Sequence, residues 1–580
     1  MSWISLEKAK ALEGRFDYIT VNESKTGYVY IDVPKENLID FLKFLKEDPD
    51  YSFKMFIDWT IIDHGEKENP RFQGVLILYS PEHKERIIVK SWATEETLPS
   101  LIDLWPAAKW AEREAWDMFG VRYEGHENLV RMFMWEGYPY HPLRKDFPIR
   151  GIEDTELPSL NEIKRQDQLE GLFNYSRMHT ALPTLEDLER TQKARMPHKQ
   201  SQIVLNWGPL HPGTHGTIWF LFDLDGEYVQ QCDIIIGQLH RGVEKIAENI
   251  GYQQFIPYTD RMDYIASINE NHAYVVSAEK MLGIHEKVPP KAKWIRTLMA
   301  ELSRINSHLL WLGTYALDLG ALTMFLYTFR EREKIMDIFE GITGARFTIN
   351  YFRIGGVFAD LPAGALDAIE HFIKDFPQRI NDYETLLTRN RIWLKRNKDV
   401  CVLTEQDVYD YGLTGAVARA SGVAYDLRKI DKYDAYGEVD FDIPVGEVGD
   451  SYDRYLVRME EMRQSAKIIQ QCIEKLRNDF TPEDPYFLEP EDPKKLKLSI
   501  DGRGLKLPEG EVYASTDNPR GELGFYIYNK KASIKPYRVR IRSGAFYNLQ
   551  IFTKAIIGRP IADAITLLST IDPVVGETDR

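Results

Sequence analysis

The feature that most constrains the fold is the apolar run LLWLGTYALDLGALTMFLYTF at residues 309–329, which carries one charge, Asp318. It is long enough to cross a bilayer. However, a charged residue at the centre of a span costs roughly 2.5–3.5 kcal/mol on insertion scales, and the flanking segments have the apolar spacing of soluble amphipathic helices. We therefore predict a helix buried in a helical bundle, and no transmembrane segment.

A carboxylate in such a core needs an explanation of its own. Because burial disfavours the charged form, Asp318 must be paired, hydrogen-bonded or protonated. Two interpretations remain open at this point: Asp318 caps a neighbouring loop, or it handles protons. The choice depends on its partners.

The length of 580 residues predicts two to four domains. Residues 1–150 alternate short β-rich runs with helical stretches, which indicates a small α/β domain. Residues 151–200 are polar and predict a partly helical tether. Residues 201–580 begin with strands and a hairpin turn at Asp225–Gly226, continue with long amphipathic helices and end with short β runs and a last helix near residues 560–568. The predicted fold class is α+β and multidomain, with a helix-bundle core and peripheral β structure in the second domain.

Charge and cysteine content exclude several functions. The net charge of −16 argues against nucleic-acid binding. Three cysteines far apart in the sequence predict neither a disulfide framework nor a metal or iron-sulfur cluster held by this chain alone. The common nucleotide-binding loops and the zincin motif do not occur, and the first residues do not resemble a secretory signal. We expect a cytoplasmic protein whose partners are proteins or small molecules.

Two segments offer partners for Asp318. In GPLHPGTHG, His211 and His215 have the spacing of helical metal ligands, but Pro212 and Gly213 favour a loop between strands. In YTDRMDY, two acids and an arginine surround Tyr264 near the start of a helix. For both segments, ordinary packing roles remain as alternatives to chemistry.

Six motifs in order, GPLHPGTHG, GQLHRGVEK, YTDRMDY, LDLGALT, RIGGV and DPVVGETDR, resemble the 49-kDa subunit of respiratory complex I. The earlier EREAWDMFG and HPLRKDFP resemble the 30-kDa subunit. The chain is therefore similar to the fused C/D subunits of bacterial complex I, NADH-quinone oxidoreductase. The resemblance implies a 30-kDa-like domain followed by a domain like the large subunit of nickel-iron hydrogenases. Those hydrogenases hold nickel through cysteine pairs, and this chain has Asp572-Pro573-Val574-Val575 where they have a DPCxxC motif.

The resemblance also implies roles for particular residues. It makes His215 and Tyr264 the proton donors to a quinone headgroup, and Asp318 the partner of His215. It places Arg241 beside a 4Fe-4S cluster held by a neighbouring subunit, although a salt bridge between Arg241 and Glu244 is the alternative from sequence alone. Thr348 also lies near the cluster by resemblance.

Three segments of the sequence depart from the family pattern. Thr348 stands where many relatives have histidine, and threonine does not change charge with pH. We therefore predict a low, pH-independent cluster potential and a low-potential acceptor such as menaquinone. GHENLVR differs from the usual GHPxLRR at Glu127 and Val130, and residues 529–535 lack a usual glycine turn.

As partners, the resemblance implies a cluster-bearing B-type small subunit, the other iron-sulfur and flavin subunits of the peripheral arm, and a membrane H-type subunit. The location it implies is peripheral, on the cytoplasmic side of the bacterial inner membrane, with proton translocation in the complex. Two alternatives remain: a related membrane complex fed by ferredoxin, and a catalytic hydrogenase, which the missing thiolates disfavour.

Overall fold

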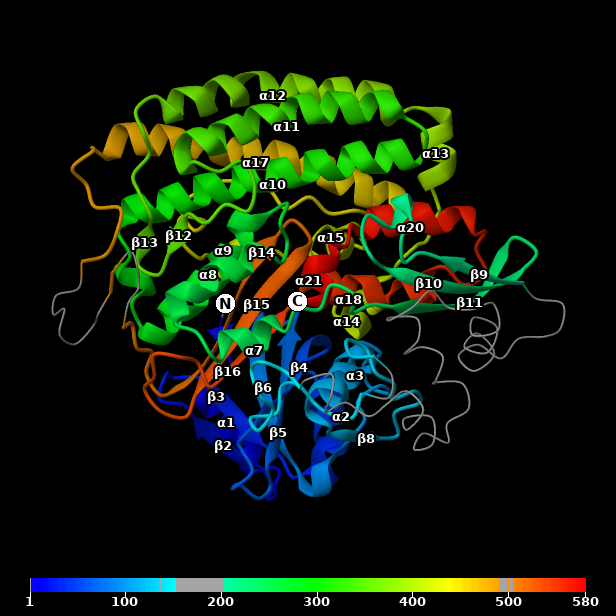
Figure 1. Cartoon of the computed structure of the whole chain (residues 1–580), viewed down its shortest axis with the longest axis vertical. Helices are drawn as coiled ribbons and strands as arrows, with labels where there is room; N and C mark the ends of the chain where they lie inside the picture. Colours follow the sequence, from blue (N-terminus) through cyan, green and yellow to red (C-terminus); the bar gives the residue numbers. More distant parts are fainter. Residues whose placement is uncertain (1, 136–137, 153–202, 490–497, 500–503) are drawn as a thin grey trace.

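A mixed six-stranded sheet organises the N-terminal part of the computed structural model (Figure 1). Its order is β2 (Thr20–Glu23), β3 (Val29–Asp32), β6 (Glu85–Ala93), β5 (Phe72–Ser80) and β4 (Met55–Asp63), with β1 (Ser2–Trp3) parallel to β6. Strands β4 and β5 are buried along their whole length, so they are covered on both faces. The main helices of this part are α1 (Leu6–Glu13), α2 (Leu38–Glu47) and α3 (Ala108–Phe119).

The structure describes residues 2–135, 138–152, 203–489, 498–499 and 504–580. Almost all of the predicted tether at 151–200 lies outside these residues, and so its partly helical character stays a prediction.

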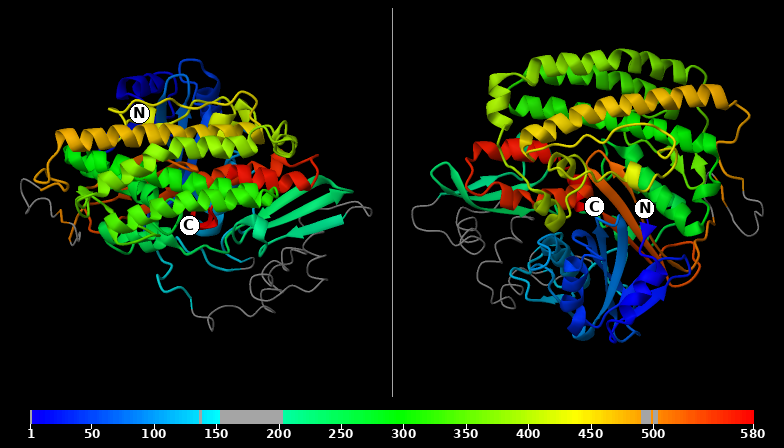
Figure 2. Two further views of the ribbon diagram at one scale, coloured as in Figure 1. Left: turned by 90° about the horizontal axis from the view of Figure 1, so that it is seen from above. Right: turned by 180° about the vertical axis from the view of Figure 1, so that it is seen from behind.

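A three-stranded antiparallel sheet follows, in the order β11 (Tyr228–Ile235), β10 (Trp219–Asp225), β9 (Ile203–Trp207). The predicted hairpin is confirmed: Asp225 pairs with Tyr228 across a two-residue turn, and Gly226 has a φ of 62°. This sheet projects from the body of the molecule beside α20 (Ala562–Ile571) (Figures 1 and 2).

The predicted bundle is also confirmed. Four long helices lie side by side at one end of the molecule (Figures 1 and 2): α10 (Pro290–Asp318), α11 (Leu322–Thr343), α12 (Ala365–Leu387) and α17 (Ser451–Asp479). Beneath them lie α8 (Tyr252–Thr259) and α9 (Ser267–Leu282). Almost every residue of α9 is buried, because this helix packs between α10 and the C-terminal three-stranded sheet described below.

The prediction of one buried helix over 309–329 is wrong in part. Helix α10 ends at Asp318 and α11 begins at Leu322, so the run forms two helices joined by a turn at Gly320, whose φ is 91°. The first half is core, but Leu322 and Leu326 on α11 are exposed. Glycine in a left-handed conformation ends a helix readily, and this local effect overrides the continuous apolar pattern. Within the described residues, no helix is long and apolar enough to span a membrane.

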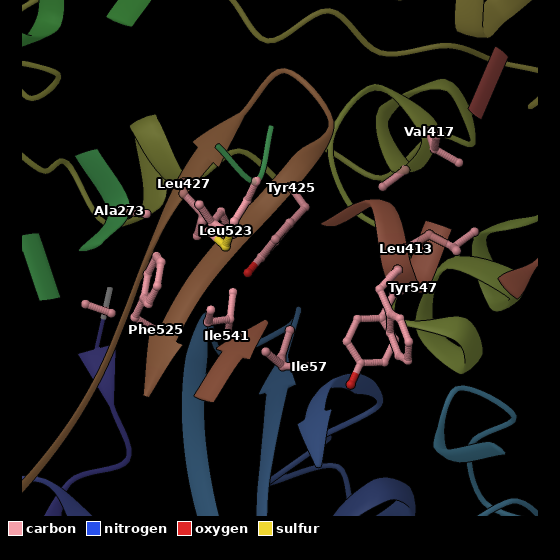
Figure 3. Close-up of a cluster of buried hydrophobic side chains, with 14 of the residues drawn as sticks. Ile57, Ala273, Leu413, Val417, Tyr425, Leu427, Leu523, Phe525, Ile541 and Tyr547 are labelled. Carbon is pink, nitrogen blue, oxygen red and sulfur yellow. The ribbon is translucent and has the colours of Figure 1, made fainter. Parts of the chain in front are cut away.

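The predicted C-terminal strands form a three-stranded antiparallel sheet: β14 (Gly510–Asn518), β15 (Gly521–Asn529) and β16 (Arg538–Arg542). It lies between the helices and the N-terminal sheet (Figure 1). Figure 3 shows the shared core, in which Ile57 of β4 lies beside Ile541 of β16 and near Phe525 of β15. The chain ends with α18 (Gly544–Gln550), α19 (Phe552–Ala555), α20 and α21 (Val575–Asp579).

Buried ion pairs cross the contact between the N-terminal sheet and the rest of the chain. Arg540 Nη2 lies 2.9 Å from Asp58 Oδ1, and Arg580 Nη2 lies 2.7 Å from Glu114 Oε2. Because a buried charge without a partner costs several kcal/mol, these pairs fix one docking geometry.

The two departures from the family pattern in the N-terminal part, Glu127 and Val130, have defined surroundings. Glu127 pairs with Lys109, and the carbonyl of Val130 accepts a hydrogen bond from Arg113 at 3.2 Å. Close to them, Phe133 also contacts the second part of the chain: its ring stacks on that of His240, with centroids 4.7 Å apart. In the segment 529–535, Lys530 Nζ donates to the carbonyl of His64 at 2.7 Å, so this segment also contacts the N-terminal part.

Candidate functional site

The short helix α21 is the point at which three distant loops meet. A Cβ atom on Gly216 would lie 2.3 Å from Val575 Cγ2, so the loop after His215 packs directly on α21. A Cβ atom on Gly576 would lie 2.7 Å from the carbonyl oxygen of Met262 and 3.6 Å from Arg241 Nη2. The loops carrying His215, Arg241 and Tyr264 therefore surround α21.

The structure brings His215 and Asp318 together, the pair that the family resemblance implied. His215 Nε2 lies 2.8 Å from Asp318 Oδ2, although the residues are about one hundred positions apart. Burial would lower the pKa of His215, but the hydrogen bond to Asp318 and its negative charge outweigh this, and the pKa is raised. The same carboxylate oxygen accepts a hydrogen bond from Ser569 Oγ of α20 at 3.0 Å. The structure therefore places a hydrogen-bonded histidine–carboxylate pair at the end of α10, in which Asp318 favours the protonated form of His215.

The loop between β9 and β10 holds His215 in a left-handed conformation, with a φ of 52°, after one 3-10 turn at Pro212–Thr214. His211 has a different role. Its Nδ1 accepts hydrogen bonds from Trp207 Nε1 at 2.6 Å and from the backbone of Gly213 at 3.0 Å. His211 thus stabilises the turn, and the two histidines do not act as a helical pair of metal ligands.

Tyr264 lies in the turn between α8 and α9, shortly before the helix begins. Its ring contacts Phe347, with centroids 5.7 Å apart, and its hydroxyl makes no hydrogen bond within the described part of the chain. Burial and then the charge of Asp263 raise its pKa. A phenol with a raised pKa and an uncommitted hydroxyl can donate a proton to a basic oxygen.

Arg241 does not form the salt bridge with Glu244 that was the alternative from sequence. Its Nη2 donates to the carbonyl oxygen of Arg261 at 2.9 Å, and its side chain is partly exposed. Glu244 is instead bound by Arg538 at 2.6 Å. Burial is the largest single effect on the pKa of Glu244 and would raise it. The charges of the neighbouring arginines together outweigh burial and lower this pKa to about 2.

Thr348 lies directly after Phe347, in a left-handed conformation with a φ of 47°. Because Phe347 contacts the ring of Tyr264, the segment that carries Thr348 belongs to the same region. The next residue, Ile349, donates from its backbone to Ser267 Oγ at 3.0 Å, which attaches the segment to the start of α9.

Sequence reasoning missed a buried polar group behind Tyr264. Asp263, Glu270 and Glu577 place carboxylate oxygens within 4.8 Å of one another, and Arg520 binds Asp263 at 2.6 Å. Asp263 was visible as an acid of YTDRMDY and Glu577 as an acid of DPVVGETDR, but neither motif indicated that their side chains meet, and Glu270 lies outside the six motifs. Their grouping depends on contacts between α9, α21 and the β14–β15 turn, which no local pattern reveals.

The cysteines do not contribute to this region. Cys232, Cys401 and Cys472 are buried, unpaired and well separated in the fold, on β11, in the loop after α13 (Arg391–Asn397) and on α17. The residues around α21 offer carboxylates, an imidazole and a phenol, which do not suit the nickel and iron of a hydrogenase centre.

Comparisons with known proteins agree with this architecture. The model of the respiratory-chain NADH dehydrogenase 30 Kd subunit matches residues 31–153, and that of the 49 Kd subunit matches residues 318–580. The C/D subunit of NADH-quinone oxidoreductase from Sulfurihydrogenibium sp. (strain YO3AOP1) is 81% identical over the whole of both chains. The first of two C/D subunits from Aquifex aeolicus (strain VF5) is 58% identical, also over the whole of both chains.

A relative without the N-terminal part is informative as well. The D subunit of NADH-quinone oxidoreductase from Magnetococcus marinus is 47% identical over 66% of this chain and 98% of its own length. The second part of the present chain thus corresponds to a protein that occurs separately. The chain belongs to the family of NADH-quinone oxidoreductase C/D subunits, in which the 30-kDa and 49-kDa subunits of respiratory complex I are joined in one polypeptide.

Proposed function

We propose that this chain forms the quinone headgroup site of its complex and supports electron transfer to quinone from a 4Fe-4S cluster in a neighbouring subunit. The observation that carries the proposal is the contact of 2.8 Å between His215 and Asp318 at the end of α10. The loop after His215 also packs on α21. The loops of Tyr264 and Arg241 meet the same short helix. One region therefore offers two proton donors and a cation, and none of the three cysteines of the chain lies in it.

The chemistry requires two electrons and two protons, which convert a quinone to a quinol. The electrons come from the cluster. In our proposal His215 gives one proton to one carbonyl oxygen, and Tyr264 gives the second proton to the other oxygen. The raised pKa of His215 favours the protonated imidazole before reduction, and the raised pKa of Tyr264 favours the neutral phenol until the reduced quinone is a stronger base.

Asp318 couples the reaction to the rest of the fold. After His215 has lost its proton, Asp318 keeps a negative charge that is no longer balanced by the imidazolium. It lies at the turn between α10 and α11 and is hydrogen-bonded to Ser569 on α20. A change in the charge of this pair acts on the ends of three helices, and we propose this as the first step of coupling to proton translocation.

Electrons enter near Arg241 and Thr348. A guanidinium beside the cluster stabilises its reduced, more negative form and raises its potential. Thr348 cannot take up a proton, and the potential is therefore expected to be low and independent of pH. This supports menaquinone as the acceptor.

The partners follow from this arrangement. The cluster belongs to the B-type subunit, which in our proposal covers the side of Arg241 and Thr348, and the quinone arrives from a membrane H-type subunit. The other iron-sulfur and flavin subunits supply electrons from NADH. In this proposal the chain is a peripheral subunit on the cytoplasmic side of the bacterial inner membrane.

The test is Tyr264→Phe in the assembled complex. We expect about a 10²-fold loss of NADH:quinone reductase activity, the lower end of what a positioned acid contributes, with unchanged NADH:ferricyanide activity and cluster signals. The matched control is Tyr258→Phe, because Tyr258 is a partly exposed tyrosine in the same segment. Normal quinone turnover in Tyr264→Phe would show that this residue is not a donor.

Two measurements address the alternatives. Stoichiometric nickel in the purified complex would support a hydrogenase and contradict the proposal. Purification without flavin and NADH-oxidising subunits, but with a ferredoxin-reactive partner, would support the related ferredoxin-fed complex.

A further inference from the structure

Three acidic side chains meet in the interior behind Tyr264. Asp263 and Glu270 are fully buried and Glu577 is 2% exposed. One oxygen of each lies within 4.8 Å of the other two. They come from the turn before α9, from α9 itself and from α21, and this group of three is called the acid cluster below.

Too few cations lie near the acid cluster to neutralise it. Arg520 Nη1 donates to Asp263 Oδ2 at 2.6 Å, and its Nη2 lies 3.3 Å from Asp572 Oδ2. One guanidinium thus serves two aspartates, and Glu270 and Glu577 form no ion pair within the described ranges. The charged groups nearby on other elements have their own partners, since Arg304 binds Asp517 and Arg261 binds Asp260.

Hydrogen bonds do not stabilise a full set of negative charges either. Glu577 Oε1 accepts from Ser543 Oγ at 2.9 Å and from the backbone of Ala545 at 3.2 Å. Glu270 Oε1 accepts from Asn518 Nδ2 at 3.0 Å, but Glu270 Oε2 is buried and has no hydrogen-bond partner among the residues that the structure describes. A buried carboxylate oxygen without a donor is costly, whereas a protonated carboxyl group at the same place is neutral.

Arg520, the cation bound to Asp263, also has buried atoms without hydrogen bonds to the described residues. Arg520 is 2% exposed, and its Nε and Nη2 atoms have no geometrically good hydrogen bond within the described part of the chain. Among the residues described, unpaired donor atoms of Arg520 and an unpaired acceptor oxygen of Glu270 are thus both buried in this region, which indicates a site where a proton or a small polar species is held. A divalent cation fits less well, because the positive charge of Arg520 already occupies the side of Asp263.

The directions of the pKa shifts agree with this geometry. Burial and then the charges of Glu577 and Asp263 raise the pKa of Glu270 well above its ordinary value. Burial and then Asp263 raise the pKa of Glu577. Carboxyl groups that interact this strongly titrate as a unit, so the proton belongs to the acid cluster rather than to one side chain.

The acid cluster is electrostatically connected to both proposed donors. Asp263 precedes Tyr264 in the chain, and its charge raises the pKa of Tyr264. On the other side, Arg520 joins Asp263 to Asp572, whose charge contributes to the raised pKa of His215. A new negative charge at either donor therefore interacts electrostatically with the acid cluster.

We propose that Asp263, Glu270 and Glu577 together hold one proton at neutral pH and return it to Tyr264 after that residue has protonated the quinone. The step is a proton transfer only: the O–H bond of the carboxyl group breaks, an O–H bond forms on the tyrosinate, and a carboxylate remains. Solvent later supplies a proton to that carboxylate. The inference rests on the proposed role of Tyr264, and it makes the acid cluster a positioned proton store for the same site.

The variant that tests this is Glu270→Gln in the assembled complex. Glutamine has the shape of a protonated glutamate but no acidic proton, so we expect folding, thermal stability and cluster signals to be unchanged. The infrared spectrum should lose the C=O stretch of a protonated carboxyl group. The first quinol per complex should form at the normal rate, and steady-state turnover should fall about tenfold, less than the 10²-fold or more lost with a direct donor.

The matched control is Glu112→Gln. Glu112 is buried in the N-terminal part, and burial raises its pKa to about 8. Its carboxylate accepts hydrogen bonds from the Leu101 backbone and from Ser100 Oγ, which lower the pKa but do not outweigh burial. This variant should also lose a carboxyl band, but its turnover should stay normal. Glu577→Gln provides a second variant of the acid cluster if Glu270→Gln does not assemble.

The outcomes separate the two proposals. An unchanged carboxyl band, or normal steady-state turnover, in Glu270→Gln would overturn the proton store while leaving Tyr264 as a donor. If Glu270→Gln loses the band but Tyr264→Phe keeps normal turnover, the donor role of Tyr264 is refuted, and with it the transfer step. Stoichiometric Mg²⁺ or Ca²⁺ that disappears in Glu270→Gln would show a metal site instead and also overturn the inference.

Discussion

Replacing Asp318 with asparagine keeps the shape of the side chain but removes the negative charge 2.8 Å from His215 Nε2. An opposite charge at this range raises the pKa of a histidine by about 1–3 units, and each unit is about 1.4 kcal/mol. Burial, which lowers the pKa of His215, is unaffected by the substitution. We therefore expect the pKa of His215 to fall from above its ordinary value to below it.

The consequence for activity has a definite sign. If His215 gives a proton to the quinone, the rate falls as pH rises through its pKa, because the imidazolium is lost. In Asp318→Asn the alkaline limb of NADH:quinone reductase activity should move to lower pH by about one unit or more. The pair also stabilises the fold below the ordinary histidine pKa of about 6.5, and this contribution disappears as pH rises through the raised pKa.

The assay compares pH profiles of quinone reduction, normalised to NADH:ferricyanide activity, for the unmodified complex, Asp318→Asn and Asp318→Glu. The glutamate variant keeps the charge and should retain most of the alkaline limb. Asp367→Asn is a surface control, since the Asp367 side chain is 79% exposed. An alkaline limb that stays in place in a fully assembled Asp318→Asn complex would refute the reasoning.

Three further predictions follow from single positions. Thr348→His should give the neighbouring cluster a potential that falls with rising pH, by at most about 59 mV per unit for one electron and one proton, whereas a pH-dependent potential in the unmodified complex would contradict our interpretation of Thr348. Arg540→Met should destabilise the contact between the two parts by about 3–5 kcal/mol because Asp58 loses its buried partner, and Lys25→Ala at an exposed pair should cost less than about 1 kcal/mol; equal melting temperatures would argue against docking by buried charges. Gly216→Ala should displace the His215 loop from α21, since its Cβ would lie 2.3 Å from Val575, and quinone reduction should fall while cluster signals persist.

Local elements of the fold could be predicted because they depend on local chemistry. The Asp225–Gly226 hairpin, the C-terminal strands and the amphipathic bundle helices follow from turn residues and from apolar spacing. The break at Gly320 was missed, because an apolar run gives no sign that a glycine will leave the helical conformation.

The site was predicted only through its motifs. The resemblance selected His215, Tyr264, Asp318, Arg241 and Thr348, and the structure brings the first and third into contact. It did not select Glu270 or Arg520, which lie outside the six motifs, and it gave no role to Glu577, although this residue lies in DPVVGETDR.

The sequence by itself determined the kinds of element, the family and the loss of thiolates from the old metal motif, since these depend on residue identity and short spacing. Only the tertiary structure decided which charges share one buried space, because loops near residues 215, 241 and 264 meet α21, which lies more than three hundred residues further along the chain. Burial and Coulomb interactions act through distance in space, not along the chain, and so the raised pKa values of His215, Glu270 and Glu577 are a property of the folded protein.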